Sequence, residues 1–179
     1  MPGRIRRDPR IQFLVFVLFL TLALVSKWLE PYLSQDSTSP SSTINEGEQE
    51  VLRVVDGDTL LLKKDRVRVR LQGIDTPETV KEDTAVQAWG PEATEYTKRF
   101  VAEAGGKLTF TIDGELEDRY GRKLRFVWNN DRLLNEELVA AGLARAKLGY
   151  DYSQSMKDRL RRAQDRARGA KLGIWGTIR

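Results

Sequence analysis

Three short apolar runs separated by tight turn signals constrain the fold of this chain most strongly. The runs VLRVV at 51–55 and TLLLKK at 59–64 flank the turn sequence DGD, and RVRVRLQGI at 66–74 alternates basic and apolar residues. A period of two is typical of β-strands with one buried face, and Asp-Gly between two such runs is a hairpin signal. This part of the chain therefore predicts a meander of three strands.

The chain from residue 90 onward alternates helical and strand patterns. GPEATEYTKRFVAEAGG at 90–106 predicts a helix that starts at Pro91 and ends at two glycines. Its predicted buried stripe consists of Ala93, Tyr96, Phe100, Val101 and Ala104. KLTFTID at 107–113 and KLRFVW at 123–128 predict two more strands.

Two further helices are predicted after the last strand. The first lies in NEELVAAGLA with Asn135 as its cap, and the second covers 153–169, after which Trp175 is expected to dock the tail onto the core. The predicted inward face of the second helix contains Met156, Leu160, Ala163 and Ala167. The order βββ-α-ββ-α-α predicts an α+β fold, a five-stranded OB-fold barrel with three α-helices.

The first fifty residues differ in composition from the rest. Residues 1–10 are arginine-rich and predict a basic leader, and residues 11–29, with the run IQFLVFVLFLTLALV, predict a membrane anchor or an export signal. Residues 30–50 are polar and serine-rich and predict a flexible linker, which leaves 51–176 as the folded domain. Because the arginines precede the apolar run, we expect a cytoplasmic N-terminus and an extracytoplasmic domain on an uncleaved anchor, with secretion after signal cleavage as the alternative.

The chain contains neither cysteine nor histidine. Disulfides, thiolate nucleophiles, zinc sites of the usual kind and imidazole acid–base pairs are therefore excluded, and chemistry must rest on carboxylates, hydroxyls, basic side chains or a hard cation. The formal net charge is +4, but residues 1–10 alone supply +3 of it. Net charge therefore says little about a polyanionic partner for the folded part.

Four separated polar motifs carry the residues that the sequence offers for chemistry. They are DGD with Asp56 and Asp58, Arg70 at the end of the third strand, IDTPE with Asp75, Thr76 and Glu78, and DRYGR with Asp118, Arg119 and Arg122. Taken singly, each has a structural explanation as a turn, a wet strand face, a helix cap or a hairpin end. Because a barrel gathers strand ends and loops over one face, together they predict a single site.

The residue types at this predicted site suit phosphate chemistry. The carboxylates of Asp58 and Asp75 and the backbone carbonyl of Thr76 are hard oxygen ligands for calcium or magnesium. Arginines on two sides of such a cation suit a phosphodiester, because guanidinium groups and a divalent cation both stabilise negative charge on phosphate. A free carboxylate at Glu78 is then available to orient or deprotonate the attacking water.

The motifs VVDGDTL, RLQGIDTPET, GPEA, DRYGR, NEELVAAGLA and LGIW occur in order and at compatible spacing between Val51 and Trp175. In this combination the chain resembles the thermonuclease, or staphylococcal-nuclease-like, family. The resemblance implies an OB-type barrel with three helices that hydrolyses DNA and RNA phosphodiesters with Ca2+.

The same resemblance implies roles for individual residues. The implied roles are calcium ligands for Asp58, Asp75 and the Thr76 carbonyl, general base for Glu78, and phosphate clamp for Arg70 and Arg122. Arg119 and Tyr150 are expected to bind substrate, and Asp56 and Asp118 to support the site from behind. The sequence departs from the family at residues 80–88, where Lys81 is the single lysine, and at Leu148, which with Tyr150 stands where the family places two tyrosines near the substrate base.

Two other functions remain open from the sequence. A barrel of this kind can be a non-catalytic nucleic-acid- or protein-binding module, or a membrane-assembly protein in which the anchor matters most. The first predicts lost carboxylates or arginines, which this sequence retains, and no apolar patch in the sequence marks the second. We expect a monomer without an obligate protein partner that acts on DNA, RNA or both.

Overall fold

The computed structural model describes residues 47–79 and 87–176. The predictions for the basic leader, the membrane anchor and most of the linker lie outside these residues. Within the two described segments, no helix is both long and apolar enough to cross a membrane.

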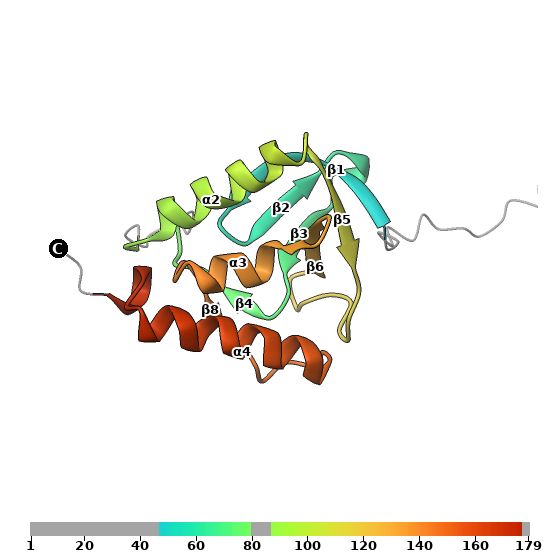
Figure 1. Cartoon of the computed structure of the whole chain (residues 1–179). Coiled ribbons are helices and arrows are strands. Elements are labelled where there is room, and N and C mark those ends of the chain that lie inside the picture. Colours follow the sequence, from blue (N-terminus) through green and yellow to red (C-terminus); the bar gives the residue numbers. More distant parts are fainter. Residues whose placement is uncertain (1–46, 80–86, 177–179) are drawn as a thin grey trace, which may run out of the picture. The chain divides into compact units, whose positions relative to one another are not determined.

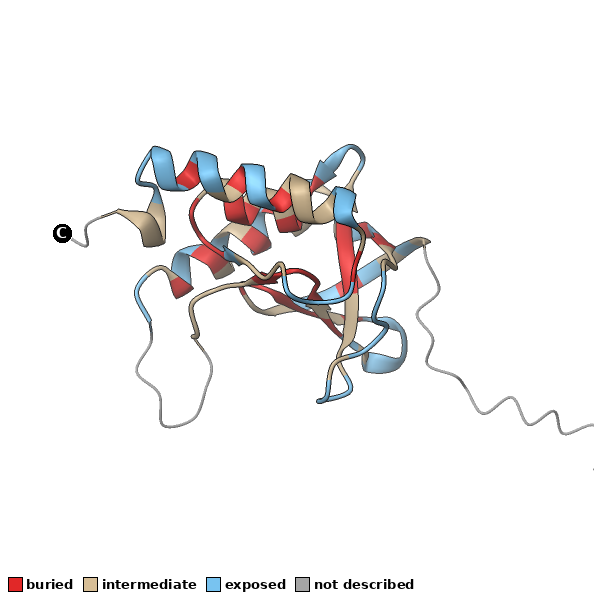
Figure 2. Ribbon diagram, turned by 90° about the horizontal axis from the view of Figure 1, so that it is seen from below, coloured by how far each residue is buried: buried red, intermediate tan, exposed pale blue. Residues whose placement is uncertain are grey.

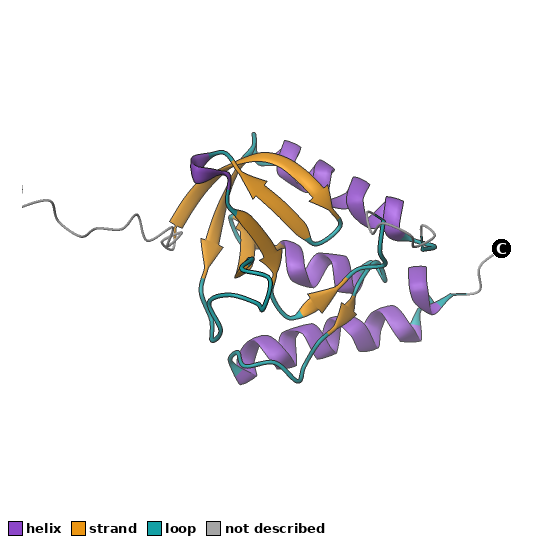
Figure 3. Ribbon diagram, turned by 180° about the vertical axis from the view of Figure 1, so that it is seen from behind, coloured by secondary structure: helices purple, strands orange, loops and turns teal. Residues whose placement is uncertain are grey.

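A closed five-stranded barrel forms the body of the folded part, as predicted (Figure 1, Figure 3). Its strands are β1 (Gly47–Asp56), β2 (Thr59–Leu62), β3 (Arg68–Leu71), β5 (Lys107–Thr111) and β6 (Lys123–Asn129). Neighbours pair antiparallel in the order β3-β2-β1-β5-β6, and parallel pairing of β3 with β6 closes the ring. Closure removes the free sheet edges that an open meander would expose.

Several very short elements are not predicted by the sequence pattern. They are β4 (Ile74–Asp75), β7 (Arg132–Leu133), β8 (Arg145–Ala146) and the 3-10 turns η1 (Lys64–Arg66) and η2 (Gly173–Trp175). A two-residue strand has no measurable periodicity, which explains the omission. The antiparallel β4–β8 pair matters most, because it joins the segment after β3 to the segment after the second helix.

The three predicted helices are present in the described part of the chain. They are α2 (Gly90–Glu103), α3 (Leu134–Ala140) and α4 (Gln154–Gly169). Helix α2 contacts β1, and α3 contacts β6 of the barrel on one side and α4 on the other. Ser153 caps α4, with its side chain accepting a hydrogen bond from the Met156 amide.

The hydrophobic core lies between the barrel and the helices (Figure 2). Each layer contributes large side chains that are at most 1% exposed: Phe100 from α2, Phe110 from β5, Phe126 from β6, Leu138 from α3 and Leu160 from α4. Burial of each such side chain contributes roughly 1.5–3 kcal/mol to folding. The core therefore fixes the strand ends that carry the polar motifs.

Two sequence predictions need correction. Residues 47–50, assigned to the linker, form the start of β1 and pair with 107–110 of β5, because backbone hydrogen bonds to a neighbouring strand do not require apolar side chains. Asn135 does not cap α3, whose capping position is Leu133. Asn135 is instead buried, where its side chain accepts from the Val127 amide at 3.0 Å and donates to the Gln72 carbonyl at 2.8 Å.

Two further packing predictions are modified by the structure. On α2, Thr97 is buried, whereas Tyr96 and Val101, which were predicted to be buried, are half-buried. The Thr97 hydroxyl donates to the Gly57 carbonyl at 2.6 Å, which gives this buried polar group a partner. Trp175 is half-buried and stacks between two guanidinium groups, those of Arg145 at 4.5 Å and Arg168 at 5.0 Å from its ring centre. The tail is thus held at the surface by cation–π contacts.

Candidate active site

The turn between β1 and β2 is locked onto helix α2. The Asp58 amide donates to Asp56 Oδ1 at 3.0 Å, which shapes the turn. A Cβ atom at Gly57 would lie 2.8 Å from Ala93 Cβ and 3.0 Å from the Thr76 side chain, so glycine is required for this close approach. The α2 contact through Thr97 adds a hydrogen bond, and the start of β2 is held in one position.

Asp58 presents a buried carboxylate with several donors. The residue is 4% exposed, and its Oδ2 accepts from both the amide and the hydroxyl of Thr76, each at 2.9 Å. Its Oδ1 accepts from the Thr59 hydroxyl at 3.2 Å, and Arg70 forms an ion pair with Oδ2. Both oxygens of this buried carboxylate thus have donors in the fold.

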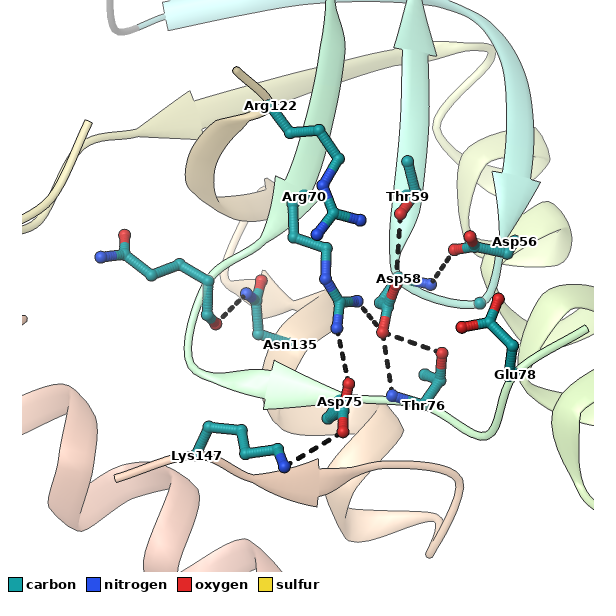
Figure 4. A network of polar contacts seen from close by, with 12 residues as sticks. Asp56, Asp58, Thr59, Arg70, Asp75, Thr76, Glu78, Arg122, Asn135 and Lys147 are labelled. Carbon is teal, nitrogen blue, oxygen red and sulfur yellow. Dashed lines mark hydrogen bonds and ion pairs between the residues drawn. The ribbon is translucent and has the colours of Figure 1, made fainter. Parts of the chain in front are cut away.

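Arg70 projects from β3 into the space between two carboxylates (Figure 4). One guanidinium nitrogen, Nη1, pairs with Asp58, and the other, Nη2, lies 2.8 Å from Asp75 Oδ1. Burial lowers the pKa of Arg70, and the charge of Asp75 opposes that shift. An arginine remains protonated in such a setting, so a permanent positive charge sits between the two candidate cation ligands.

Asp75 and Thr76 reach this region because β4 pairs with β8 beneath it. The Asp75 side chain is 44% exposed, and its second oxygen, Oδ2, lies 3.1 Å from the Lys147 ammonium. Thr76 contacts Asp58 through its amide and hydroxyl. The calcium role assigned to the Thr76 carbonyl stays a prediction.

The residues present fit a hard divalent cation. Asp58 and Asp75 pair with the two terminal nitrogens of one guanidinium group, that of Arg70, so the two carboxylates lie on neighbouring sides of it. Carboxylate oxygens are the donors that calcium and magnesium prefer. Among residues 47–79 and 87–176, no group of three or more acidic side chains gathers to hold a metal. The candidate site therefore has two carboxylates, few for a calcium site, and weak binding is expected.

The backbone at Glu78 is fixed by a partner that sequence reasoning missed. The Gln87 amide donates to the Glu78 carbonyl at 3.0 Å, and the Glu78 amide donates to Gln87 Oε1 at 3.2 Å. Gly90 packs against the same segment, where a Cβ atom would lie 3.2 Å from the Glu78 carbonyl oxygen and 2.5 Å from Thr79 Cγ2. No motif identified Gln87, because its role depends on contacts across residues 79–86.

Arg122 is held within its own hairpin. Its Nε donates to Asp118 Oδ2 at 2.7 Å, and its amide donates to Asp118 Oδ1 at 3.0 Å. Burial alone would raise the pKa of Asp118, but the hydrogen bonds from Arg122 and from the Tyr120 amide outweigh it and lower the pKa. Asp118 thus holds the Arg122 side chain against its own hairpin, and the supporting role assigned to it stays a prediction.

Two surface cavities meet at Arg122. One, of about 220 Å³, is also lined by Arg70, Asp75, Lys147 and Tyr150. The other, of about 860 Å³, contains Glu78 on its wall. Arg122 therefore lines one cavity together with the other predicted phosphate-binding arginine and a second cavity together with the predicted base.

The predicted supporting residue Asp56 and the two predicted substrate-binding residues, Tyr150 and Arg119, differ in how closely they approach the two cavities. Asp56 lies behind Asp58, and burial raises its pKa while Thr59 and the charges of Arg70 and Arg122 oppose the rise. Tyr150 is 57% exposed and lines the smaller cavity.

Arg119 instead turns onto the neighbouring ring of Tyr120. Its Nη2 donates to the Tyr120 hydroxyl at 2.7 Å, and its guanidinium lies 4.8 Å from the ring centre. Arg119 lines neither of the two cavities. Tyr120 is 68% exposed and does line the larger one, a placement that its position in DRYGR could have signalled.

The sequence of most of the folded part matches the model of one protein family. The family model for the staphylococcal nuclease homologue matches residues 68–177, more than half of the chain, and the chain belongs to this family. The matched segment contains every candidate site residue except Asp56 and Asp58.

Individual relatives point the same way. A thermonuclease from Staphylococcus hyicus is 42% identical over 136 residues, which are 75% of this chain and 79% of the relative. A thermonuclease from Staphylococcus intermedius is 40% identical over 163 residues, 89% of this chain and 95% of the relative. Endonuclease YncB from Bacillus subtilis is 38% identical over 128 residues, 69% of this chain and 59% of the relative.

Proposed function

We propose that this chain is a calcium-dependent nuclease that hydrolyses phosphodiester bonds of DNA, RNA or both. Membership of the staphylococcal nuclease family and similarity to thermonucleases and an endonuclease support phosphodiester hydrolysis. The observation that carries the proposal is the cluster around Arg70. Asp58 and Asp75 both pair with the Arg70 guanidinium group, and Arg70 and Asp75 line a cavity that Arg122 also lines.

The two arginines bind and orient the phosphate in this proposal. Asp118 engages Arg122 through Nε and Nη2, which leaves Nη1 for substrate, because Nη1 has no partner among the residues that the structure describes. Arg70 lines the same cavity and supplies the second guanidinium group of this proposed clamp. A divalent cation bound at Asp58 and Asp75 would stabilise negative charge on the phosphate oxygens.

In this proposal, Glu78 orients or deprotonates the attacking water. Its backbone is anchored to Gln87, and it lines the same cavity as Arg122. A carboxylate there accepts a hydrogen bond or a proton from a water that approaches the phosphorus. The water oxygen then forms a bond to phosphorus as one P–O ester bond breaks, the leaving oxygen takes a proton from solvent, and the arginines stabilise the charge that develops on phosphate.

Cleavage of a fluorescently labelled single-stranded DNA by the full-length chain, purified in mild detergent, tests the proposal. We expect cleavage with calcium and none with excess chelator, and a parallel RNA substrate reports the sugar preference. Calcium-dependent binding without cleavage would instead support the non-catalytic module. Cleavage that is equal with calcium and with chelator would contradict the calcium requirement.

We also propose, from the sequence, that residues 11–29 tether the nuclease domain outside the cytoplasmic membrane. The support is the apolar run preceded by arginines, which favours a cytoplasmic N-terminus. Membrane fractionation followed by N-terminal sequencing tests this proposal. An intact N-terminus in the membrane fraction supports an anchor, whereas a shortened chain in the medium supports secretion.

A further inference from the structure

Lys147 has a closely held backbone and a partly exposed side chain. Its amide donates to the Gly73 carbonyl at 2.8 Å, and its carbonyl accepts from the Tyr152 hydroxyl at 2.9 Å. Gly73 has a φ of +74°, and a Cβ atom there would lie 2.9 Å from Leu160 Cδ1, so the backbone is closely packed below Lys147. The Lys147 side chain itself is 43% exposed.

The Lys147 ammonium shares Asp75 with Arg70. It lies 3.1 Å from Asp75 Oδ2, while Arg70 Nη2 lies 2.8 Å from Oδ1 (Figure 4). Both members of the Lys147–Asp75 pair are more than two-fifths exposed, so solvent screens the attraction and the pair exchanges readily. A lysine on a flexible four-carbon stem can then turn to another anion within reach.

The cavity that Lys147 lines offers space for such an anion. Its walls carry three cationic side chains, those of Arg70, Arg122 and Lys147, together with the exposed ring of Tyr150. Arg122 is bonded to Asp118, which also lines this cavity, as does Glu115. A cation held by Asp75 would weaken the Lys147–Asp75 pair, and the Lys147 ammonium would then be available to an anion in the cavity that it lines.

We propose that Lys147 is a substrate-positioning residue that contacts a backbone phosphate next to the one that is cleaved, and that Asp75 holds it in place before substrate binds. The inference rests on the proposed nuclease function. Lys147 follows β8, on the side of Asp75 away from Asp58, so it meets a different part of a bound strand from the arginine pair (Figure 4). An ammonium binds phosphate as a point charge, which suits a grip on the backbone without base selection.

Steady-state cleavage by the Lys147→Met variant tests this role, with calcium saturating and salt varied. We expect the KM for single-stranded DNA to rise about tenfold with kcat changed by less than about twofold, because one charge-assisted contact to bound substrate is lost. The slope of log kcat/KM against log salt should become shallower by about 0.7, the value for one phosphate contact on a single strand. Lys147→Arg should keep the slope of the unaltered chain.

A matched control and a measurement without turnover separate this role from a structural one. Lys98→Met removes a comparable surface lysine, 52% exposed and paired with Glu95 at 2.6 Å on α2, and should change neither KM nor slope. Calcium affinity of Lys147→Met, measured by calorimetry without substrate, should equal or exceed that of the unaltered chain, because a competitor for Asp75 is removed.

Two results would overturn the inference about Lys147. An unchanged KM and salt slope in Lys147→Met would remove it from substrate binding, and weaker calcium binding with a fallen kcat would make it a support for the site. Failure of the unaltered chain to cleave would count against the nuclease proposal alone. In that case, oligonucleotide binding can be followed by fluorescence anisotropy at several salt concentrations. The slope of log affinity against log salt, compared between the unaltered chain and Lys147→Met, still tests whether Lys147 contacts a phosphate.

Discussion

The two arginines at the candidate site are held in different ways. Arg70 stands on a strand of the closed barrel, its side chain is 14% exposed, and its partners Asp58 and Asp75 come from other elements. Arg122 is 29% exposed, and its partner Asp118 lies four residues away in the same hairpin. One arginine is thus positioned by the tertiary fold, and the other by a local turn.

This difference shows that two arginines with the same proposed role, phosphate binding, can contribute differently to the stability of the fold. Removal of Arg70 leaves a buried carboxylate without its cation, which is costly to the folded state. Removal of Arg122 leaves a carboxylate that still accepts two backbone amides, those of Tyr120 and Arg122 itself, and that is near solvent. Substitutions at the two positions should therefore separate stability from activity.

The largest effect is expected for Arg70→Met. We predict a turnover loss on the order of 10³-fold, because a charge that stabilises the transition state is removed. The same change should lower the free energy of unfolding by about 3 kcal/mol in chelator, since Asp58 loses its partner. Calcium should restore part of that stability, which thermal unfolding with and without calcium measures. Equal stability of variant and unaltered chain in chelator would contradict the structural role of Arg70.

Smaller effects on turnover and on stability are expected for Arg122→Met. We predict a turnover loss on the order of 10²-fold for one lost transition-state contact. The melting temperature should fall much less than that of Arg70→Met, with or without calcium, because Asp118 keeps its hydrogen bonds from the hairpin backbone. If Arg122→Met unfolds as readily as Arg70→Met, the contrast between the two arginines is wrong.

Asp118→Asn should produce the smallest effect, and that effect should depend on pH. The pKa of Asp118 is lowered in the folded protein, so its ionised form contributes stability above the unfolded value of about 3.9. This contribution is lost as pH falls through the lower, folded pKa. Urea unfolding should thus show a less stable variant near neutral pH and a difference that shrinks below about pH 4. A difference that stays constant across that range would show that the Asp118 charge does not support the hairpin.

The sequence was sufficient to predict the barrel and its helices because those signals are local. Alternating residues in β3 and the Asp-Gly turn before β2 depend on neighbours in the chain, and the structure confirms them. Asn135 was misjudged because a polar residue at the start of a helix usually caps it, whereas here its amide bridges β6 and Gln72. That bridge is a long-range contact with no sequence period.

The same distinction applies to the site. The motifs indicated Asp58, Arg70 and Asp75 because these residue types recur together for phosphate chemistry, but that Arg70 lies between the two carboxylates emerged only from the structure. Lys147 belongs to no motif. It meets Asp75 because β4 pairs with β8 across some seventy residues of chain, and neither two-residue strand has a pattern to detect.

Calcium titration by calorimetry into the full-length chain and its Asp58→Asn variant tests the central claim most directly. The claim is the proposal that Asp58 and Asp75, which both pair with Arg70, together bind one divalent cation. For the unaltered chain we predict a single site with a dissociation constant on the order of 10⁻⁴ to 10⁻³ M. No measurable binding is predicted for a folded Asp58→Asn. Calcium binding of equal strength in the two proteins would contradict the account.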